Sequence, residues 1–92
     1  MARAHLIVTG RVQGVGFRAF VAREGHALGL AGWVRNLRDG SVEAEFEGAD
    51  EKVARLRLAC AQGPVHAKVF RTEELPPGAD ALPEIFQVRG DA

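Results

Sequence analysis

Asp39-Gly40-Ser41-Val42-Glu43-Ala44-Glu45-Phe46-Glu47 is the stretch that says most about the fold of this 92-residue chain. The Asp-Gly pair at its start is a strong signal for a tight β-hairpin turn. After the turn, apolar residues alternate with serine and glutamates, a pattern typical of a strand with one face on a core and the other in water. Together with residues 32–37, which look like another strand, the stretch predicts an antiparallel hairpin.

The residues before this hairpin predict a strand and a helix. Leu6 to Val8 form a short apolar run rich in β-branched residues, which indicates a buried strand. Apolar residues then recur at helical spacing from Phe17 to Leu28, and Gly29 suits the end of that helix. Gly25 lies inside this helix at an expected cost of about 1 kcal/mol relative to alanine.

The residues after the hairpin predict a second helix and two more strands. Asp50 is expected to cap the helix, which carries one apolar stripe and ends at the Gly-Pro pair of residues 63 and 64. The stripe consists of Val53, Leu56 and Cys60. Residues 65–72 predict a fourth strand, the proline-rich residues 75–83 a loop, and residues 85–88 a short last strand.

This order of elements is the pattern of a ferredoxin-like fold of the α+β class. We expect a βαββαβ sandwich in which both helices pack on one face of an antiparallel sheet, because strand–helix–strand crossovers are right-handed. The other face, which carries the glutamates, would meet water or a partner. Residues 1–92 are expected to form a single domain, as their number suits one core.

Composition restricts the classes of partner. Twelve basic and twelve acidic residues cancel, which argues against bulk attraction to nucleic acid or to an anionic membrane. No apolar run approaches the ~20 residues of a membrane span, and the first residues lack the layout of a signal peptide. Cys60 is the only cysteine, which fits a reducing compartment. We therefore expect a cytoplasmic monomer that binds neither nucleic acid nor membrane.

The segment with the most chemical content is Gln13-Gly14-Val15-Gly16-Phe17-Arg18, between the first strand and the first helix. Free backbone N–H groups and the helix dipole favour an anion at such a position. Arg18 adds a planar fork that matches phosphate oxygens. Spacing alone is also compatible with an ordinary strand-to-helix turn and a solvated arginine.

Other readings of the glycines fit the chain less well. Residues 14–19 match a dinucleotide-binding fingerprint, but the hairpin and the short chain do not suit a doubly wound sheet. Residues 14–21 loosely echo an RNA-recognition motif, which belongs on a central strand, whereas the predicted third strand exposes glutamates that repel RNA. No Gly-Lys-Ser/Thr follows the glycines, so the segment is not a P-loop.

Two longer stretches resemble the signatures of the acylphosphatase family. Gly10–Arg18 is similar to the first signature and Leu28–Asn36 to the second, and the resemblance extends over residues 5–88. Shorter matches follow in the family's order at residues 39–43, 47–48 and 63–64. The resemblance implies an enzyme that hydrolyses the mixed anhydride between a carboxylic acid and phosphate.

The resemblance also implies roles for individual residues. The phosphate would be bound by the loop residues Gln13, Gly14, Val15, Gly16, Phe17 and Arg18. Arg18 would be essential, and Asn36 would orient the attacking water. No metal or other cofactor is expected, because the histidines and the cysteine show no ligand-like spacing. The alternative is a non-catalytic anion-binding or regulatory module on the same fold, including a domain like that of larger maturation proteins.

Two features depart from the family's pattern, and two further residues carry no expected chemistry. Leu37 stands where the family often has threonine, and the chain ends in Gly90-Asp91-Ala92 without the usual aromatic residue, so the packing of the last strand is the least determined part. Trp33 is expected in the core or at the sheet edge, away from substrate. Cys60 is expected to be an inert core residue.

Overall fold

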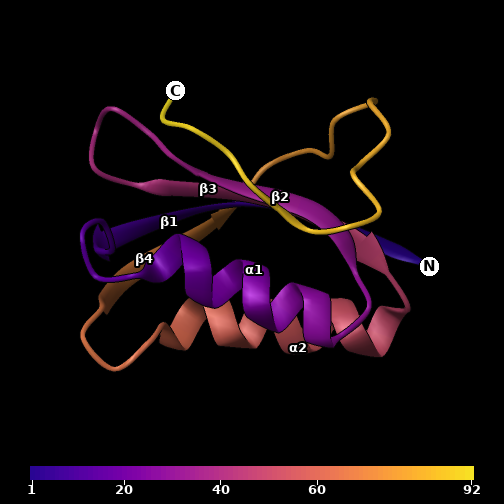
Figure 1. The fold of residues 1–92 in the computed structure, drawn as a ribbon, viewed down its shortest axis with the longest axis horizontal. Helices are drawn as coiled ribbons and strands as arrows, with labels where there is room; N and C mark the ends of the chain where they lie inside the picture. Colours follow the sequence, from indigo (N-terminus) through magenta and orange to yellow (C-terminus); the bar gives the residue numbers. More distant parts are fainter.

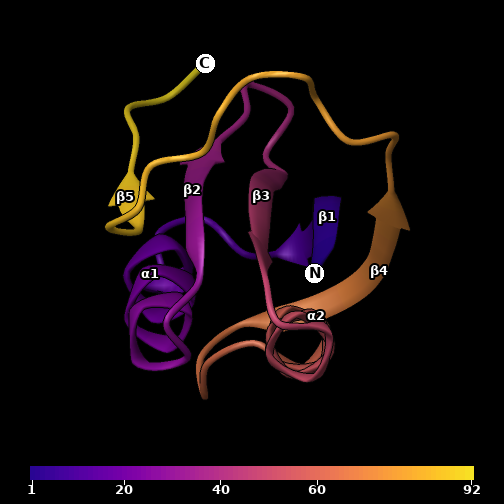
Figure 2. The same ribbon diagram turned by 90° about the vertical axis from the view of Figure 1, so that its right-hand side faces the viewer.

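The computed structural model describes all 92 residues as one sheet with two helices beneath it (Figure 1). The elements, in chain order, are β1 (Ala2–Arg11), α1 (Phe17–Ala27), β2 (Ala31–Asn36), β3 (Val42–Gly48), α2 (Asp50–Gln62), β4 (Lys68–Glu74) and β5 (Gln87–Val88). The strands lie in the order β4-β1-β3-β2-β5, and both helices cover the same face of the sheet (Figure 2). The predicted ferredoxin-like α+β fold is confirmed. Neither helix is long and apolar enough to cross a membrane.

The strands differ from the prediction in one respect of direction. The first four pair antiparallel as expected, with β3 in the centre between β1 and β2. β5 instead pairs parallel with β2, so the sheet is mixed. The reason is topological: β4 runs opposite to β2 and therefore ends at the end of the sheet where β2 begins. The chain crosses to the other edge and enters β5 from that same end, so β5 runs in the direction of β2.

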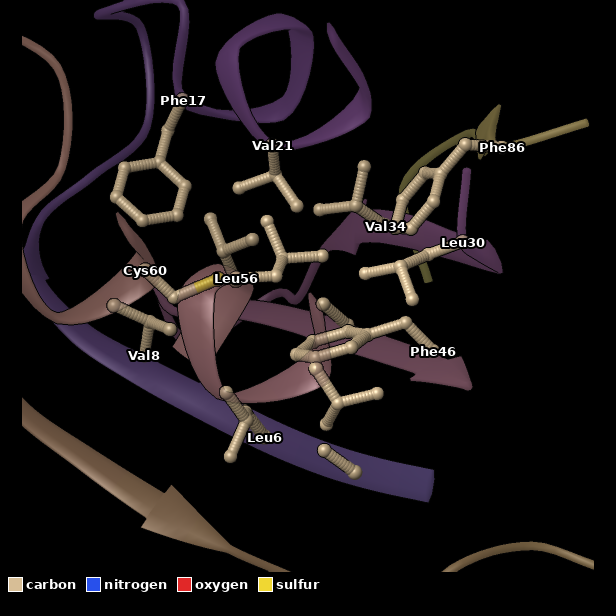
Figure 3. Close-up of a cluster of buried hydrophobic side chains, with 14 of the residues drawn as sticks. Leu6, Val8, Phe17, Val21, Leu30, Val34, Phe46, Leu56, Cys60 and Phe86 are labelled. Atoms are coloured by element: carbon tan, nitrogen blue, oxygen red, sulfur yellow. The ribbon is translucent and has the colours of Figure 1, made fainter. Parts of the chain in front are cut away.

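The core lies between the sheet and the helices (Figure 3). Phe46 from β3 and Phe17 from α1 are among its largest fully buried side chains. The predicted stripe of α2 is confirmed, since Val53, Leu56 and Cys60 are its buried residues. Burial raises the pKa of the Cys60 thiol to about 12, which keeps the thiol neutral and supports a packing role.

The opposite face of the sheet, which carries Glu43, Glu45 and Glu47 and is called here the glutamate face, is not the solvated surface that the alternation predicted. Glu43 is only 8% exposed and Glu45 only 4%. Arg3 Nε donates to Glu45 Oε2 at 3.0 Å, and Glu43 Oε2 lies 2.6 Å from His5 Nε2. The loop between β4 and β5 crosses above them (Figure 2), where the amide of Gly78 donates to Glu45 Oε2 at 2.7 Å. Glu43 and Glu45 are buried because side chains of the neighbouring strand pair with them and this loop covers the face.

Two boundaries also differ from the prediction. Helix α2 begins at Asp50 with Ala49 as its N-cap residue, so Asp50 lies in the first turn and not at the cap. A negative charge in the first turn interacts favourably with the helix dipole. β4 begins at Lys68 and not at residue 65, because the preceding residues form a turn closed by a hydrogen bond from Ala67 N to Pro64 O at 3.0 Å. Neither shift alters the order of the elements.

Candidate active site

The loop between β1 and α1 turns sharply at two glycines. Gly14 has a φ of 74° and Gly16 a φ of 79°, both in the left-handed region that a residue with a Cβ adopts at a cost. Space is not the constraint, since a Cβ at either position would meet no atom within 4 Å. The first hydrogen bond of α1 runs from Phe20 N to Gly16 O at 3.0 Å, so the amides of residues 17–19 lie outside the helical ladder. These amides suit an anion.

A hollow of about 230 Å³ opens beside this loop. The loop, the start of α1, the end of β2 and the end of β5 surround it, and its lining residues are Val12, Gly14, Gly16, Phe17, Arg18, Ala19, Asn36 and Val88. In Figure 1 the β1–α1 loop and the turn between β2 and β3 lie at the same end of the sheet. The fold therefore brings the two segments that resemble family signatures to one cavity.

Five of the seven predicted site residues line this hollow: Gly14, Gly16, Phe17, Arg18 and Asn36. The other two, Gln13 and Val15, do not. The side-chain amide of Gln13 donates to the backbone oxygens of residues 37 and 41, at 2.7 and 2.8 Å, and so ties the loop to the β2–β3 hairpin. The side chain of Val15 packs against the core. Both side chains therefore hold the loop against the rest of the protein and do not line the hollow.

Asn36 is the last residue of β2 and is 9% exposed. Its backbone oxygen accepts a hydrogen bond from Ala92 N at 3.0 Å. Its carboxamide forms no hydrogen bond within the protein. Because no side-chain N or O of the chain is both buried and unpaired, the carboxamide atoms are accessible. The carboxamide therefore reaches the hollow as a free donor and acceptor.

Arg18 lies in the first turn of α1, and its side chain is one-third exposed. Its Nη1 donates to the carbonyl oxygen of Arg89 at 3.0 Å and to Asp91 Oδ1 at 3.3 Å. Both partners belong to residues 89–92, called here the tail, which sequence reasoning did not connect with the site. The only signal in the sequence is the departure of these last residues from the family's usual ending. The two recorded bonds use Nη1, so Nε and Nη2 stay without a protein acceptor.

The site contains one cation, a set of loop amides and one carboxamide. No group of three His, Cys, Asp or Glu side chains in the chain is arranged to hold a metal ion. Asp91 is the carboxylate that contacts the cation. The arrangement can bind a small tetrahedral oxyanion through the loop amides and Arg18, with an amide group beside it that can hold a neutral molecule such as water.

Comparison with known sequences gives a consistent result. A sequence model of the acylphosphatase family matches residues 4–81. An acylphosphatase of Rhodopseudomonas palustris (strain BisB18) is 55% identical over 75 residues, which cover 82% of this chain and 76% of that protein. An acylphosphatase of Thermococcus kodakarensis is 56% identical over 71 residues, which cover 77% of this chain and 78% of that protein.

Solved structures resemble the chain at three levels. The acylphosphatase from Bacillus subtilis superposes with a TM-score of 0.87 at 36% identity, covering 97% of this chain and 99% of that one. HypF of Thermococcus kodakarensis superposes with a TM-score of 0.79 at 33% identity, but the match covers only 12% of that longer chain. A bacterial light-regulated adenylyl cyclase shares the fold alone, with a TM-score of 0.63 at 15% identity.

Proposed function

The chain belongs to the acylphosphatase family, and from this membership we propose that Arg18, the loop of residues 13–18 and Asn36 carry out metal-independent hydrolysis of an acyl phosphate to a carboxylate and inorganic phosphate. The observation that supports these roles is the convergence of Arg18, Asn36 and the two loop glycines on one hollow. The proposal includes a single domain over residues 1–92 that acts as a monomer on a small molecule in the cytoplasm.

The phosphoryl group would bind in the loop. An oxyanion bound there would meet the amides at the start of α1 and the free Nε and Nη2 of Arg18. These donors are already in place and need no rearrangement as charge shifts during the reaction. A phosphoryl-transfer transition state spreads charge over its equatorial oxygens, which is where such donors act. Because an acyl phosphate is already an activated anhydride, its hydrolysis needs no covalent nucleophile from the protein. Accordingly, neither Ser nor Cys is among the residues that line the hollow.

Asn36 would place the attacking water. Its carboxamide offers one group that donates and one that accepts, which suits a neutral water but provides no charge to hold a phosphate. The water oxygen would bond to phosphorus while the bond from phosphorus to the acyl oxygen breaks and the carboxylate leaves. The water proton would pass to a phosphate oxygen of the substrate, so inorganic phosphate remains. Holding water and substrate in line supplies much of the acceleration.

The test is turnover of an aromatic acyl phosphate, followed by its absorbance, in the presence of a chelator. We expect hydrolysis that the chelator does not reduce and that inorganic phosphate inhibits competitively. Arg18→Gln should keep the fold and lower turnover by about 10²–10³-fold or more, since it removes charge and donors from the oxyanion site. Activity that requires added Mg²⁺, or an Arg18→Gln protein at half the wild-type rate, would overturn the mechanism.

The alternative is a non-catalytic anion-binding module. It has one specific support, which is that the same fold forms a small part of the longer HypF chain. The two functions give different results with the wild-type protein alone. Phosphate binding accompanied by turnover supports the enzyme, whereas phosphate binding with no turnover of any acyl phosphate tested supports the module.

A further inference from the structure

Trp33 lies on the glutamate face, and two guanidinium groups lie over its ring. The central carbon of Arg35 is 5.2 Å from the ring centroid and that of Arg89 is 4.9 Å away. Both distances fall within the range of cation–π attraction, which is strongest for tryptophan. The register pairs Trp33 with Glu45, which places the indole on the glutamate face and therefore on the side of the sheet away from α1.

The side chain of Trp33 is fixed by its neighbours. Its residue is only 7% exposed, and the ring of His5 meets it edge-on with centroids 6.0 Å apart. Arg35 is itself fixed, because its Nε donates to Glu43 Oε1 at 2.7 Å and Glu43 also contacts His5. The ring, one of its cations and its aromatic neighbour thus belong to one connected network.

Arg89, the second cation, connects Trp33 with the site. Its backbone N donates to the oxygen of Val34 at 2.8 Å, and its backbone O accepts from Arg18 Nη1 at 3.0 Å. Its side chain lies over Trp33. One residue therefore contacts the network on the glutamate face with its side chain and the proposed phosphate-binding cation with its carbonyl.

The tail has few other anchors. Phe86 is the last buried side chain of the chain, and all residues after it are exposed. β5 is only two residues long, and beyond it the tail is held through backbone bonds to β2 and through Arg18. The contact between Arg89 and Trp33 is thus the one side-chain attachment that holds the tail to the sheet itself.

We propose that Trp33 and Arg89 are positioning residues for Arg18: the Arg89 guanidinium on the Trp33 ring fixes the Arg89 carbonyl, which holds Nη1 of Arg18. This contact turns Nε and Nη2 toward the phosphoryl group. An arginine side chain otherwise spreads over many rotamers, and each rotamer that points away from the hollow lowers the binding-competent fraction. The inference rests on the proposed role of Arg18 in phosphate binding.

The experiment compares variants on both sides of the contact. Arg89→Ala keeps the backbone carbonyl but removes the guanidinium, and we expect it to weaken phosphate binding and lower kcat/KM by about threefold to tenfold, the range that a cation–π contact of moderate strength spans. Trp33→Leu keeps both charges and should show the same loss, while Trp33→Phe retains an aromatic face and should restore most of it. Arg71→Ala is the charge-matched control, because Arg71 is an exposed arginine on the opposite edge strand.

A double variant tests whether the effect passes through Arg18. Adding Arg89→Ala to Arg18→Gln should weaken phosphate binding no further, although each single change weakens it. Melting temperatures measured on the same samples separate misfolding from positioning, and if Trp33→Leu does not fold, Arg89→Ala decides the question. The inference is overturned if Arg89→Ala behaves like Arg71→Ala or if its effect adds fully to that of Arg18→Gln. Two other outcomes would instead overturn the proposed function. They are a wild-type protein that hydrolyses no acyl phosphate and an Arg18→Gln protein that stays active.

Discussion

Asp91 places a negative charge 3.3 Å from the guanidinium of Arg18, the cation on which the proposed phosphate site depends. Asn36, by contrast, brings a carboxamide without charge and without a partner inside the protein to the same hollow. At the scale of single residues, we therefore expect two separate roles: Arg18 would set the affinity for an anion, with Asp91 opposing it, and Asn36 would act on a neutral ligand.

Asp91→Asn should tighten phosphate binding. The carboxylate of Asp91 is two-thirds exposed, so its competition for Arg18 is weak and screened by salt. We expect a gain of about twofold to threefold at low ionic strength that disappears at high salt. Titration calorimetry with phosphate at two salt concentrations measures it. Glu73→Gln, which removes an exposed charge from β4, is the control and should change nothing. Weaker binding in Asp91→Asn would show that the carboxylate supports the site.

Asn36→Ala should lower kcat by about 10²-fold or more and leave phosphate affinity within about twofold, because misplacing the water affects the reaction and not the binding of the anion. If Asn36 only ended a strand, its loss would cost about 1 kcal/mol of stability or less and leave turnover near normal. Turnover, phosphate inhibition and melting temperature from one preparation distinguish these cases. Near-normal turnover in a folded Asn36→Ala protein is the result that rejects the role.

At the scale of elements, the site depends on how one loop is held between its neighbours. Gln13 ties the β1–α1 loop to the β2–β3 hairpin with two hydrogen bonds. Helix α1 packs against the chain before β5 at Gly25, where a Cβ would overlap the ring of Phe86. The glycine that weakens the helix locally therefore permits Phe86 to pack, and Phe86 is the last buried residue before the tail that reaches Arg18.

Gln13→Ala should reduce stability and phosphate affinity together. Two hydrogen bonds to backbone oxygens are lost, which corresponds to about 1–2 kcal/mol in the free energy of unfolding. The loop then moves relative to Asn36, so the inhibition constant of phosphate should rise severalfold. Urea unfolding and phosphate inhibition measure the two effects. Gln62→Ala, an exposed glutamine at the end of α2, serves as the control and should alter neither. An unchanged inhibition constant in Gln13→Ala would mean that the loop keeps its shape without the tie.

At the scale of the whole molecule, the sheet has two different interiors. An apolar core fills the space between the sheet and the helices, and a layer of paired charges lies on the glutamate face beneath the β4–β5 loop. In that layer Glu45 binds both Arg3 and the amide of Gly78, and so connects β1, β3 and the covering loop. This face supports the tail through Trp33, which makes the ionic layer part of what positions the site.

Glu45→Gln should lower the free energy of unfolding by about 1–3 kcal/mol, because it removes a nearly inaccessible carboxylate and leaves the largely buried guanidinium of Arg3 without the anion at 3.0 Å. Glu47→Gln on the same strand should cost about 0.5 kcal/mol or less, since its contact with Arg3 is longer and more exposed. Denaturant unfolding of both proteins gives the difference, and amide exchange at Gly78 should quicken only in Glu45→Gln. Equal losses in the two variants would contradict a structural layer of charges.

Features that depend on residues close together in the chain could be predicted from the sequence. Hairpin, helices, core stripe and glycine loop follow from local periodicity and turn chemistry, and the order of these elements admitted one fold class. The resemblance of two motifs added the family, which the comparisons confirm. Arg18 and Asn36 were predicted as site residues from the same motifs, and the structure brings them to one hollow, although their roles stay predictions.

The covered surfaces and the contacts of the site could not be predicted, because they depend on how distant segments pack together. Alternation on β3 shows that the glutamates share a face, but not that a loop crosses it and that Arg3 and His5 stand beside them. The contacts of Arg18 with the tail join residues 71 and 73 positions apart. No local pattern encodes such pairs, because they arise when β4 and β5 take opposite edges of the sheet and the chain between them must cross the one face that the helices leave open.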